Sequence, residues 1–507
     1  MTIADLYSLN GSDLGEKPAV IFEDKVLSHS KFEKRTNQFA NLLISMGYKR
    51  NDRIAILSKN HIEYPVIIFG AVKAGVTFTP INYRMTSTEV TSLLKHCNPK
   101  GLFFSEEFVD IVQSVKNHVE VKDYFNIDCN ESIKESYSKL LNFQSTERPN
   151  ISVDNKDVYY IGYTSGTTGN PKGIISTHES RKMLVLSEAI EFGIGEKDIQ
   201  LITAPIYHSA PHSFLITQIV MGGTLVIMKE FEPEEVLKNI DKYNVTNFFM
   251  APTMYNFVLE LDENVKAKYD TSSVKTLISA GSSLPTRTKE RIISFFSHSG
   301  LFEFYGASEI GVNIVLRPDQ QMETERSVGK PALFNDIKIL DKDGNEVSDG
   351  EVGEIYVKNP FRFSGYLDNP EETEKASHKG YTTVGDLAKK DKNGFYYIVG
   401  RKKDMVISGG VNIYPEEIED VLYKHPYVRE VAIIGVPDEK WGESLKAFIV
   451  PRGNNVNEHD IIDYCKQHLA SYKKPKSIEF VQDLPRNAAG KVLKTELRKP
   501  FWDSQFA

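Results

Sequence analysis

The sequence predicts an α/β protein with a large N-terminal domain of parallel sheets, a β-rich subdomain and a small α+β domain at the C-terminus. Three observations predict this organisation. Strand-like and helical patterns alternate along most of the chain, which is typical of parallel sheets covered by helices. The alternation gives way to hairpin patterns near Asp336. A separate, compact α+β pattern of about one hundred residues follows Gly400.

The first elements show the alternation clearly. Residues 30–46 have apolar side chains at helical spacing and end at Gly47, and residues 53–57 (RIAIL) form a short apolar run typical of a buried strand. Next come a helix over 61–74 and a strand over 77–79. The same order returns as strand 223–228, helix 234–243, strand 245–250, helix 253–260, strand 274–279 and helix 286–296.

The later elements follow turn signals. Asp343-Gly344 indicates a hairpin turn, and residues 391–394 (DKNG) mark a second turn before a strand over 395–399. Beyond this point Pro415 opens a helix, because proline and acids suit a first helical turn. We therefore predict a domain over 1–400, a boundary at 401–404 and a domain over 405–507, the last with strands 431–436 and 445–450 and helix 458–469.

Composition excludes several classes of protein. The chain has 507 residues, 40% of them hydrophobic, and a net charge of −8. An acidic chain is not suited to general phosphate-backbone binding, so no nucleic acid partner is expected. The three cysteines, Cys97, Cys129 and Cys465, form no CxxC pattern, which fits a reducing cytosol and no structural zinc. The apolar run 64–72 is too short to span a membrane. We expect a cytoplasmic protein without integral membrane association.

A loop rich in small residues suggests phosphate binding. Residues 163–173 (YTSGTTGNPKG) follow an apolar run and combine glycines, hydroxyl groups and one lysine. Glycines let the backbone approach a ligand closely, and successive N–H groups can hold an anion. The same composition also suits a flexible connector. The loop is not a Walker A motif, because no GK[ST] closes a GxxxxG frame, and this disfavours a P-loop GTPase or kinase.

This loop and six further motifs resemble the adenylate-forming superfamily, which includes acyl-CoA synthetases, firefly luciferase and the adenylation domains of nonribosomal peptide synthetases. The motifs stand in the family order over essentially the whole chain. They are APIYH (204–208), SAGSS (279–283), YGASE (305–309), GD (385–386), GRKKD (400–404) and PRNAAGK (485–491).

The resemblance implies a two-step reaction. A carboxylate attacks the α-phosphate of ATP to give acyl-adenylate and pyrophosphate, and a thiol then displaces AMP. It also implies that the C-terminal domain is a lid that turns about a hinge at Lys403. The expected ligands are ATP, Mg²⁺ and CoA, together with a small carboxylic acid. The resemblance leaves undecided whether the protein forms a homodimer.

Joining two anions requires charge neutralisation and alignment. By the resemblance, the loop holds the β- and γ-phosphates, and Glu309 holds Mg²⁺ with Thr164 nearby, since a hard cation prefers oxygen ligands. The family usually has threonine where Ser308 stands, and serine keeps the hydroxyl. The loop residues assigned to the nucleotide are Thr164, Ser165, Gly166, Thr167, Thr168, Gly169 and Lys172.

The rest of the nucleotide site is also assigned by resemblance. Asp386 accepts hydrogen bonds from both ribose hydroxyls, and Arg401 adds a ribose or phosphate contact. Val384 stands where the family usually has threonine or serine. Tyr305 stacks on adenine, although a tyrosine alone would more often be a core residue. The adenine slot comprises Gly281, Ser282, Ser283, Glu303, Phe304, Tyr305, Gly306, Ala307 and Ser308.

The two steps use different parts of the lid. Lys491 is the expected catalytic cation of the first step, placed between the carboxylate and the α-phosphate. Ser408, Gly409 and Gly410 are expected to line the pantetheine tunnel of the second step, although Gly409-Gly410 alone would suit an ordinary turn. Lys473, Lys474 and Lys476 could attract the phosphates of CoA or form a solvated face.

The acid-binding side centres on His208, assigned by the family to the acyl pocket and CoA entrance. A metal pair with His212 is rejected because Pro211 is expected to interrupt any helix aligning the two, and His212 is left as a pocket-edge candidate. Histidine at 208 also argues against amino-acid substrates, which the family pairs with aspartate there. The remaining acyl or CoA candidates are Tyr207, Ser279 and Ala280, within pocket segments 207–212, 251–254, 279–281 and 306–312.

The sequence favours an AMP-forming acid–CoA ligase acting on a hydrophobic monocarboxylate, either a medium- or long-chain fatty acid or a bulky aromatic acid. The alternative is an enzyme that loads an acyl group onto a carrier-protein phosphopantetheine. A third reading, a binding protein that kept the fold, is disfavoured by the joint presence of Lys491, Glu309, Asp386 and Arg401. Chain length, acceptor, oligomeric state and pathway stay open.

Overall fold

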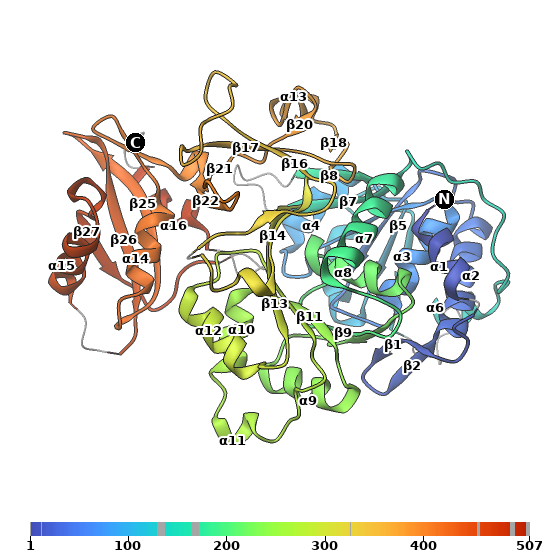
Figure 1. Cartoon of the computed structure of the whole chain (residues 1–507). Helices are drawn as coiled ribbons and strands as arrows, with labels where there is room; N and C mark the ends of the chain where they lie inside the picture. Colours follow the sequence, from blue (N-terminus) through green and yellow to red (C-terminus); the bar gives the residue numbers. More distant parts are fainter. Residues whose placement is uncertain are drawn as a thin grey trace.

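The computed structural model describes residues 2–11, 13–128, 137–164, 172–324, 326–453, 457–486 and 492–502. Within these ranges, two large sheets form most of the N-terminal domain (Figure 1). The nine-stranded sheet has the order β15-β14-β13-β12-β11-β9-β10-β1-β2. Its strands are β1 (Pro18–Phe22), β2 (Lys25–Ser28), β9 (Ile199–Ile202), β10 (Thr224–Ile227), β11 (Asn247–Met250), β12 (Thr276–Ser279), β13 (Gly300–Ala307), β14 (Gly311–Leu316) and β15 (Lys330–Pro331).

The second sheet has the order β18-β8-β7-β4-β3-β5-β6. Its strands are β3 (Arg53–Leu57), β4 (Thr77–Pro80), β5 (Gly101–Phe104), β6 (Asp123–Asn126), β7 (Val158–Thr164), β8 (Lys172–Thr177) and β18 (Gly365–Tyr366). Parallel pairs form the centre of both sheets, as the alternating pattern predicts. The fold class is therefore confirmed.

Helices fill the space between the sheets and cover their outer faces. Every residue of α3 (Glu63–Ala74) is buried, and α8 (Ser209–Val220) is buried from Pro211 onward. Both helices contribute to one core cluster with residues of both sheets. The apolar run 64–72 is thus a core helix. No helix in the described part of the chain has the length and apolarity needed to cross a bilayer.

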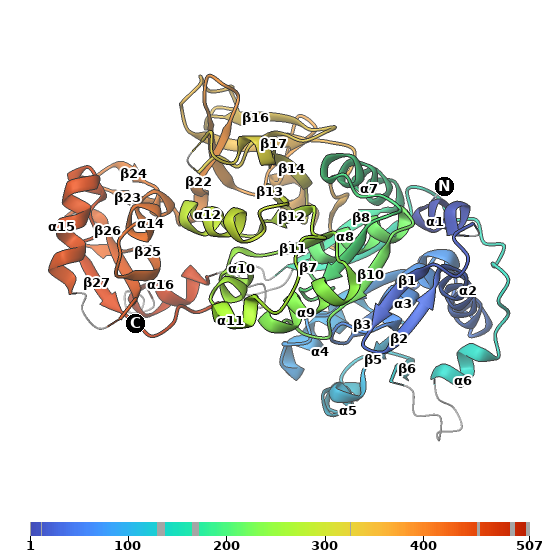
Figure 2. The same cartoon turned by 60° about the horizontal axis from the view of Figure 1, so that its bottom comes forward.

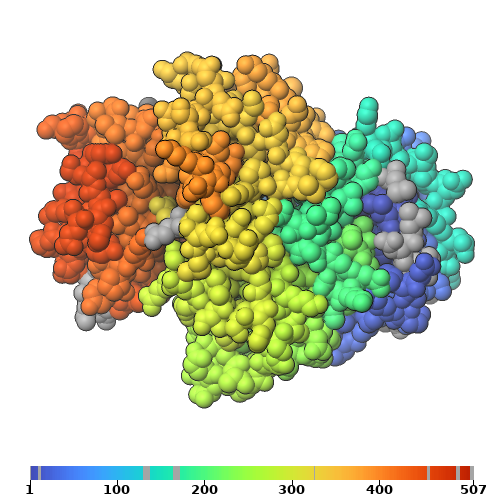
Figure 3. Space-filling model, in the orientation of Figure 1, coloured from blue at the N-terminus to red at the C-terminus, as the bar shows by residue number. Residues whose placement is uncertain are grey.

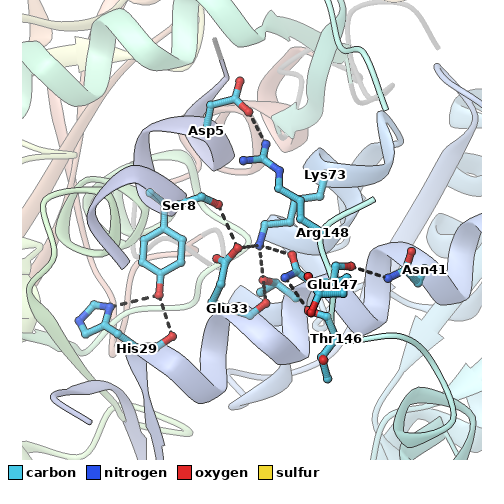
Figure 4. A network of polar contacts seen from close by, with 12 residues as sticks. Asp5, Ser8, His29, Glu33, Asn41, Lys73, Thr146, Glu147 and Arg148 are labelled. Atoms are coloured by element: carbon cyan, nitrogen blue, oxygen red, sulfur yellow. Dashed lines mark hydrogen bonds and ion pairs between the residues drawn. The ribbon is translucent and has the colours of Figure 1, made fainter. Parts of the chain in front are cut away.

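A buried ion-pair network joins the first helices of the chain (Figure 4). Lys73 of α3 lies at its centre and bonds Glu33 of α2 (His29–Ser45) at 2.8 Å, with Thr36 and Asn37 as further acceptors. Burial lowers the pKa of Lys73 to about 8, with the attraction of Glu33 opposing the shift. Because all three partners lie on α2, this lysine fixes the α2–α3 contact.

The β-rich subdomain and the C-terminal domain have sheets of their own, and the C-terminal domain lies at one end of the molecule (Figures 1 and 2). The six-stranded sheet contains β16 (Asp336–Leu340), β17 (Gly353–Lys358), β19 (Ser377–His378), β20 (Tyr381–Thr382), β21 (Asp386–Lys390) and β22 (Tyr396–Arg401). The five-stranded sheet contains β23 (Val406–Ser408), β24 (Val411–Ile413), β25 (Val428–Asp438), β26 (Gly442–Pro451) and β27 (Ser477–Phe480), packed with α14 (Pro415–Tyr423), α15 (Glu458–His468) and α16 (Lys494–Trp502).

The remaining helices connect the strands. They are α1 (Ile3–Gly11), α4 (Ser87–Cys97), α5 (Val109–Lys116), α6 (Tyr137–Asn142), α7 (His178–Phe192), α9 (Pro233–Tyr243), α10 (Pro252–Leu259), α11 (Glu263–Lys266), α12 (Thr286–Phe295) and α13 (Pro370–Lys375). Short 3-10 turns include η3 (Lys402–Asp404), between β22 and β23. Cys97 and Cys465 are buried free thiols, and Cys129 lies outside the described residues.

Candidate active site

The candidate site lies where parallel strand ends meet. β9, β11, β12 and β13 are neighbours and run parallel, so their carboxyl ends share one edge of the nine-stranded sheet. The segments expected to form the acyl pocket and adenine slot lie at these ends: 207–212 after β9, 251–254 after β11, 279–283 at the end of β12 and 306–312 at the end of β13. Ligands of open α/β sheets characteristically bind at this edge. The topology thus brings the four predicted segments together.

Three predicted nucleotide residues meet through hydrogen bonds and charge. The Tyr305 hydroxyl donates to Asp386 Oδ2 at 2.8 Å, and Arg401 Nε lies 3.2 Å from Asp386 Oδ1. The three side chains come from β13, β21 and β22, which belong to two different sheets. Burial, with Asp386 adding to it, raises the pKa of Tyr305 well above its usual value, so the phenol stays a donor.

Asp386 still has capacity to accept hydrogen bonds. The side chain is 6% exposed, and its Oδ1 atom is buried without a hydrogen-bond partner among the described residues. Arg401 neutralises the charge at this oxygen by proximity rather than by an aligned hydrogen bond. A buried acceptor left in this way fits a hydroxyl donor such as that of a ribose.

The other side chains of the predicted adenine slot divide between two environments. Glu303 lies within 2.6 Å of Lys289 in α12, and burial raises the pKa of the Glu303 carboxyl against the pull of Lys289. Phe304 points the other way, because side chains alternate along a strand, and packs with Phe214 and Phe249. Gly281, Ser282 and Ser283 form an exposed turn. Through its side chain, Tyr305 is the member of the 303–305 run that reaches Asp386.

Glu309 is held by the segment that precedes α13. Its carboxylate accepts a hydrogen bond from the Tyr366 hydroxyl at 2.9 Å, and its carbonyl accepts one from the Phe363 N–H at 2.7 Å. Burial raises the pKa of Glu309, with the Tyr366 hydrogen bond acting in the opposite direction. Ser308 beside it donates to Ser209 Oγ at 2.9 Å, which connects this motif to the start of α8.

The residues around Glu309 fit a hard cation. Glu309 is half-buried and burial raises the pKa of its carboxyl, so a divalent ion bound there would offset the charge of the carboxylate. The other predicted ligand, Thr164, ends β7, but its side chain lies outside what the structure describes. No cluster of three or more His, Cys, Asp or Glu suited to a metal occurs among the described residues. The site therefore fits an ion held jointly by one carboxylate and a nucleotide.

Lys172 is the described end of the predicted phosphate loop. Its ammonium pairs with Glu372 of α13 at 2.5 Å and lies 5.0 Å from the centre of the Tyr366 ring. The Lys172 hydrogen bond lowers the pKa of Glu372. Ser165, Gly166, Thr167, Thr168 and Gly169 lie outside the described residues.

The structure corrects the expectation for the two histidines. Pro211 does not interrupt a helix: α8 starts at Ser209, and Pro211 lies in its first turn, where backbone N–H groups need no intrahelical partner. The His212 N–H accordingly donates to the His208 carbonyl at 3.1 Å. His208 is half-buried at the N-cap beside Tyr207. His212 is 1% exposed, bonds Tyr159 and stacks on Tyr160.

Two further acyl candidates lie beside this edge. Ser279 is 1% exposed at the end of β12, and its hydroxyl has no partner among the described residues. Ala280 follows it and is also buried. Gly306 and Ala307 pair with the start of β14, and a β-carbon at Gly306 would lie 2.1 Å from the Gly311 carbonyl oxygen. Glycine at 306 thus permits the close approach of β13 and β14.

The lid residues lie in a different setting. Ser408 ends β23, and Gly409 and Gly410 form an exposed hairpin turn with φ of 58° and 82°. A β-carbon at Gly409 would lie 2.6 Å from the Trp441 ring, so both φ and contact favour glycine. Lys403, the predicted hinge, lies in η3 between the two domains. Lys491 lies outside the described residues.

Sequence reasoning did not single out Tyr366 or Glu372. Both lie in the stretch 363–375, whose visible signal is the Asn369-Pro370 helix start, with Asn369 as N-cap of α13. That signal predicts a short helix but not the hydrogen bond to Glu309, which joins residues 57 positions apart.

Comparison with known proteins defines the class. A family model described as AMP-binding enzyme matches residues 10–367, and one described as AMP-binding enzyme C-terminal domain matches residues 417–491. The chain therefore belongs to the AMP-binding enzyme family, and it has the large and small domains of adenylate-forming enzymes.

Individual relatives are acyl-CoA ligases. The chain is 32% identical to the long-chain-fatty-acid–CoA ligase FadD13 of Mycobacterium tuberculosis and 32% identical to the feruloyl-CoA synthase of an Amycolatopsis species, in each case over 94% of both chains. The crystal structure of the anthranilate CoA ligase AuaEII in complex with anthranoyl-AMP is similar with a TM-score of 0.91 at 25% identity. The similarity covers 100% of this chain and 98% of that chain.

Proposed function

We propose that this enzyme is an AMP-forming acid–CoA ligase that acts on a hydrophobic monocarboxylate. The observation that carries the proposal is the set Tyr305, Asp386 and Arg401, joined across two sheets, with Glu309 following the end of β13. It offers a ribose acceptor, a cation and a metal-binding carboxylate within one site. The proposal is supported by the relatives, which are named as ligases of different acids.

In the first step, this chain's residues would bind and align two anions. Asp386 would accept the ribose hydroxyls, Tyr305 would cover the adenine face, and Arg401 would reduce the negative charge around them. Mg²⁺, held by Glu309 and Thr164, would neutralise phosphate charge when bound. Lys491 would stabilise the charge that develops as the acid attacks the α-phosphate, so that acyl-adenylate forms and pyrophosphate leaves.

An apolar cluster beside the strand ends supports a hydrophobic acid. Phe214, Phe249 and Phe304 pack together with ring centroids 5.8–6.2 Å apart, and Phe249 and Phe304 are only partly buried. The space next to Phe249 and Pro211 has a volume of about 10 Å³, room for roughly one water molecule. Any hydrophobic acyl group entering here, linear or aromatic, would have to displace these rings and would then pack against them.

The C-terminal domain offers features suited to CoA. Trp441 and Tyr472 are 43% and 50% exposed, and lysines lie over both rings. Exposed aromatic faces flanked by ammonium groups suit a purine carrying phosphates. Lys476 also pairs with Asp438, so part of this charge is compensated within the domain. This arrangement favours a free nucleotide-bearing thiol as the acceptor, and the enzyme would meet ATP and CoA together in the cytoplasm.

The test is AMP release from ATP and Mg²⁺ with a panel of acids, with and without CoA. The panel runs from acetate through long-chain fatty acids to benzoate, cinnamate and bile acids. CoA-dependent AMP with one hydrophobic class supports the proposal and names the substrate. Pyrophosphate exchange without CoA turnover would instead indicate a carrier-protein acceptor, and release with acetate alone would contradict the hydrophobic class.

A further inference from the structure

One short segment holds Glu309 at two points. The Phe363 N–H donates to the Glu309 carbonyl at 2.7 Å, and the Tyr366 hydroxyl donates to Glu309 Oε1 at 2.9 Å. Both the backbone and the carboxylate of Glu309 are therefore fixed by residues 363–366.

The position of Tyr366 is itself fixed on three sides. It pairs with Ile174 of β8, its N–H donates to Thr373 Oγ1 at 2.9 Å, and its ring meets Phe363 edge-on at 4.9 Å. The next residue, Leu367, donates from its N–H to the Gly173 carbonyl at 2.7 Å. β8 begins at Lys172, at the end of the predicted phosphate loop. Tyr366 therefore pairs with the strand that contains Lys172.

Lys172 lies over the other side of this tyrosine. Its ammonium is 5.0 Å from the ring centroid. It also pairs with Glu372, which lies in α13, six residues after Tyr366. Tyr366 thus lies between the lysine expected to face phosphate and the carboxylate expected to hold the metal. A side chain in this place can set the distance and orientation of one relative to the other.

We propose that Tyr366 is a positioning residue for the metal-binding carboxylate of Glu309, a role that rests on the proposed function. By donating to Oε1 it occupies one carboxylate oxygen and leaves the second for the cation. A carboxylate held in this way would bind a cation mainly through its second oxygen. Mg²⁺ accepts this readily, whereas Ca²⁺ often takes both oxygens of a carboxylate. Tyr366 therefore favours Mg²⁺ over Ca²⁺ in the nucleotide complex.

The test uses the full chain without any acid, so that ATP binds but is not consumed. Calorimetry gives the affinity for ATP in EDTA, in Mg²⁺ and in Ca²⁺. For Tyr366→Phe we expect unchanged affinity in EDTA, a loss of about ten-fold in the tightening caused by Mg²⁺, and little loss in that caused by Ca²⁺. Tyr381→Phe is the matched control, because its phenol also donates to a carboxylate, Asp336, at a distant position in the β-rich subdomain.

Two further variants keep the outcomes distinct. Thr373→Val removes the acceptor of the Tyr366 N–H and should give a smaller loss of the tightening of ATP binding by Mg²⁺. This variant carries the test if Tyr366→Phe does not fold. Glu309→Gln should abolish the Mg²⁺ effect. If it does not, the metal assignment in the proposed function fails. If Glu309→Gln abolishes the effect but Tyr366→Phe keeps the wild-type ratio of Mg²⁺ to Ca²⁺ affinity, the role of Tyr366 is overturned and the proposed function stands.

Discussion

The nucleotide side of the large domain and the hairpin of the C-terminal domain differ in how firmly they are held. Tyr305, Asp386 and Arg401 are joined across two sheets, and Glu309 is bonded to Tyr366. The turn at Gly409 and Gly410 is exposed and belongs to a domain that lies as a separate mass at one end of the molecule (Figure 3).

Ion pairs join the large domain to the C-terminal domain and to the boundary segment. Arg326 pairs with Asp420 of α14, and Lys402 of the boundary segment pairs with Glu354 of β17 at 2.8 Å. The chain itself crosses through η3. From this difference we infer that the proposed nucleotide site is preformed, whereas the proposed thiol step would depend on a domain that changes its position. Four substitutions test this division.

The largest effect is expected for Lys491→Ala. Removing the cation proposed to act between the acid and the α-phosphate should slow adenylation by a factor of at least about 100, because the charge that develops in the transition state would lose its stabilisation. Pyrophosphate exchange measures this step. Thioester formation from supplied acyl-adenylate should stay near the wild-type rate, and an equal loss in both half-reactions would contradict the division.

Gly409→Leu should have the opposite pattern. Its φ of 58° and the Trp441 ring 2.6 Å from a β-carbon leave no room for a side chain, so the hairpin must shift. We expect pyrophosphate exchange to persist and CoA turnover to fall roughly a hundred-fold, through loss of the near-attack geometry of the thiol. Gly453→Leu is the control, since it also has positive φ in the same domain but open space around it. Intact CoA turnover in Gly409→Leu would refute the tunnel assignment.

Asp386→Asn should weaken ATP binding. The amide keeps the shape but loses the charge that pairs with Arg401 and one acceptor oxygen, so we expect the KM for ATP to rise roughly ten- to hundred-fold with smaller changes for acid and CoA. Initial rates over a range of ATP concentrations measure this. Asp336→Asn, which also loses a tyrosine partner but lies in the β-rich subdomain, should be neutral. Equal KM changes in both variants would contradict a ribose role.

Arg498→Gln should give the smallest effect and bear on the hinge. Arg498 of α16 donates to the Lys403 carbonyl at 3.4 Å and to Asp404 Oδ1 at 2.7 Å. The pair is largely buried but lies beside the proposed hinge and not at the nucleotide site, so releasing it should change overall CoA turnover about three-fold while leaving pyrophosphate exchange within error. A larger loss in exchange than in turnover would show that Arg498 supports the nucleotide site instead.

Local patterns predicted the elements well, because burial and turn chemistry act over a few residues. Residues 53–57 form β3 without adjustment, and Pro415 opens α14 as expected. The prediction that Pro211 interrupts a helix was wrong, because proline is tolerated in the first turn of a helix. The sequence gives no capping signal for the start of α8 at Ser209. The strand over 431–436 is also longer, running from Val428 to Asp438 along its partner β26.

The sequence predicted those site residues that belong to a motif. It did not predict a residue whose role depends on a contact with a distant part of the chain. Tyr305 and Asp386 come from motifs 81 positions apart, and the sheets bring them together with Arg401. Tyr366 has no motif of its own in the printed sequence, and its contact with Glu309 depends on β18 pairing with β8. Contacts that arise from strand pairing between distant segments leave no local periodicity to read.

The central claim is that the enzyme activates its acid as an acyl-adenylate. The most direct measurement uses the acid identified by the panel, labelled with ¹⁸O in its carboxylate, with ATP and CoA. Attack of the carboxylate on the α-phosphate predicts one ¹⁸O in the AMP released, seen as a mass increase of the nucleotide. Label in inorganic phosphate, or AMP without label, would show a different route of activation and contradict the account.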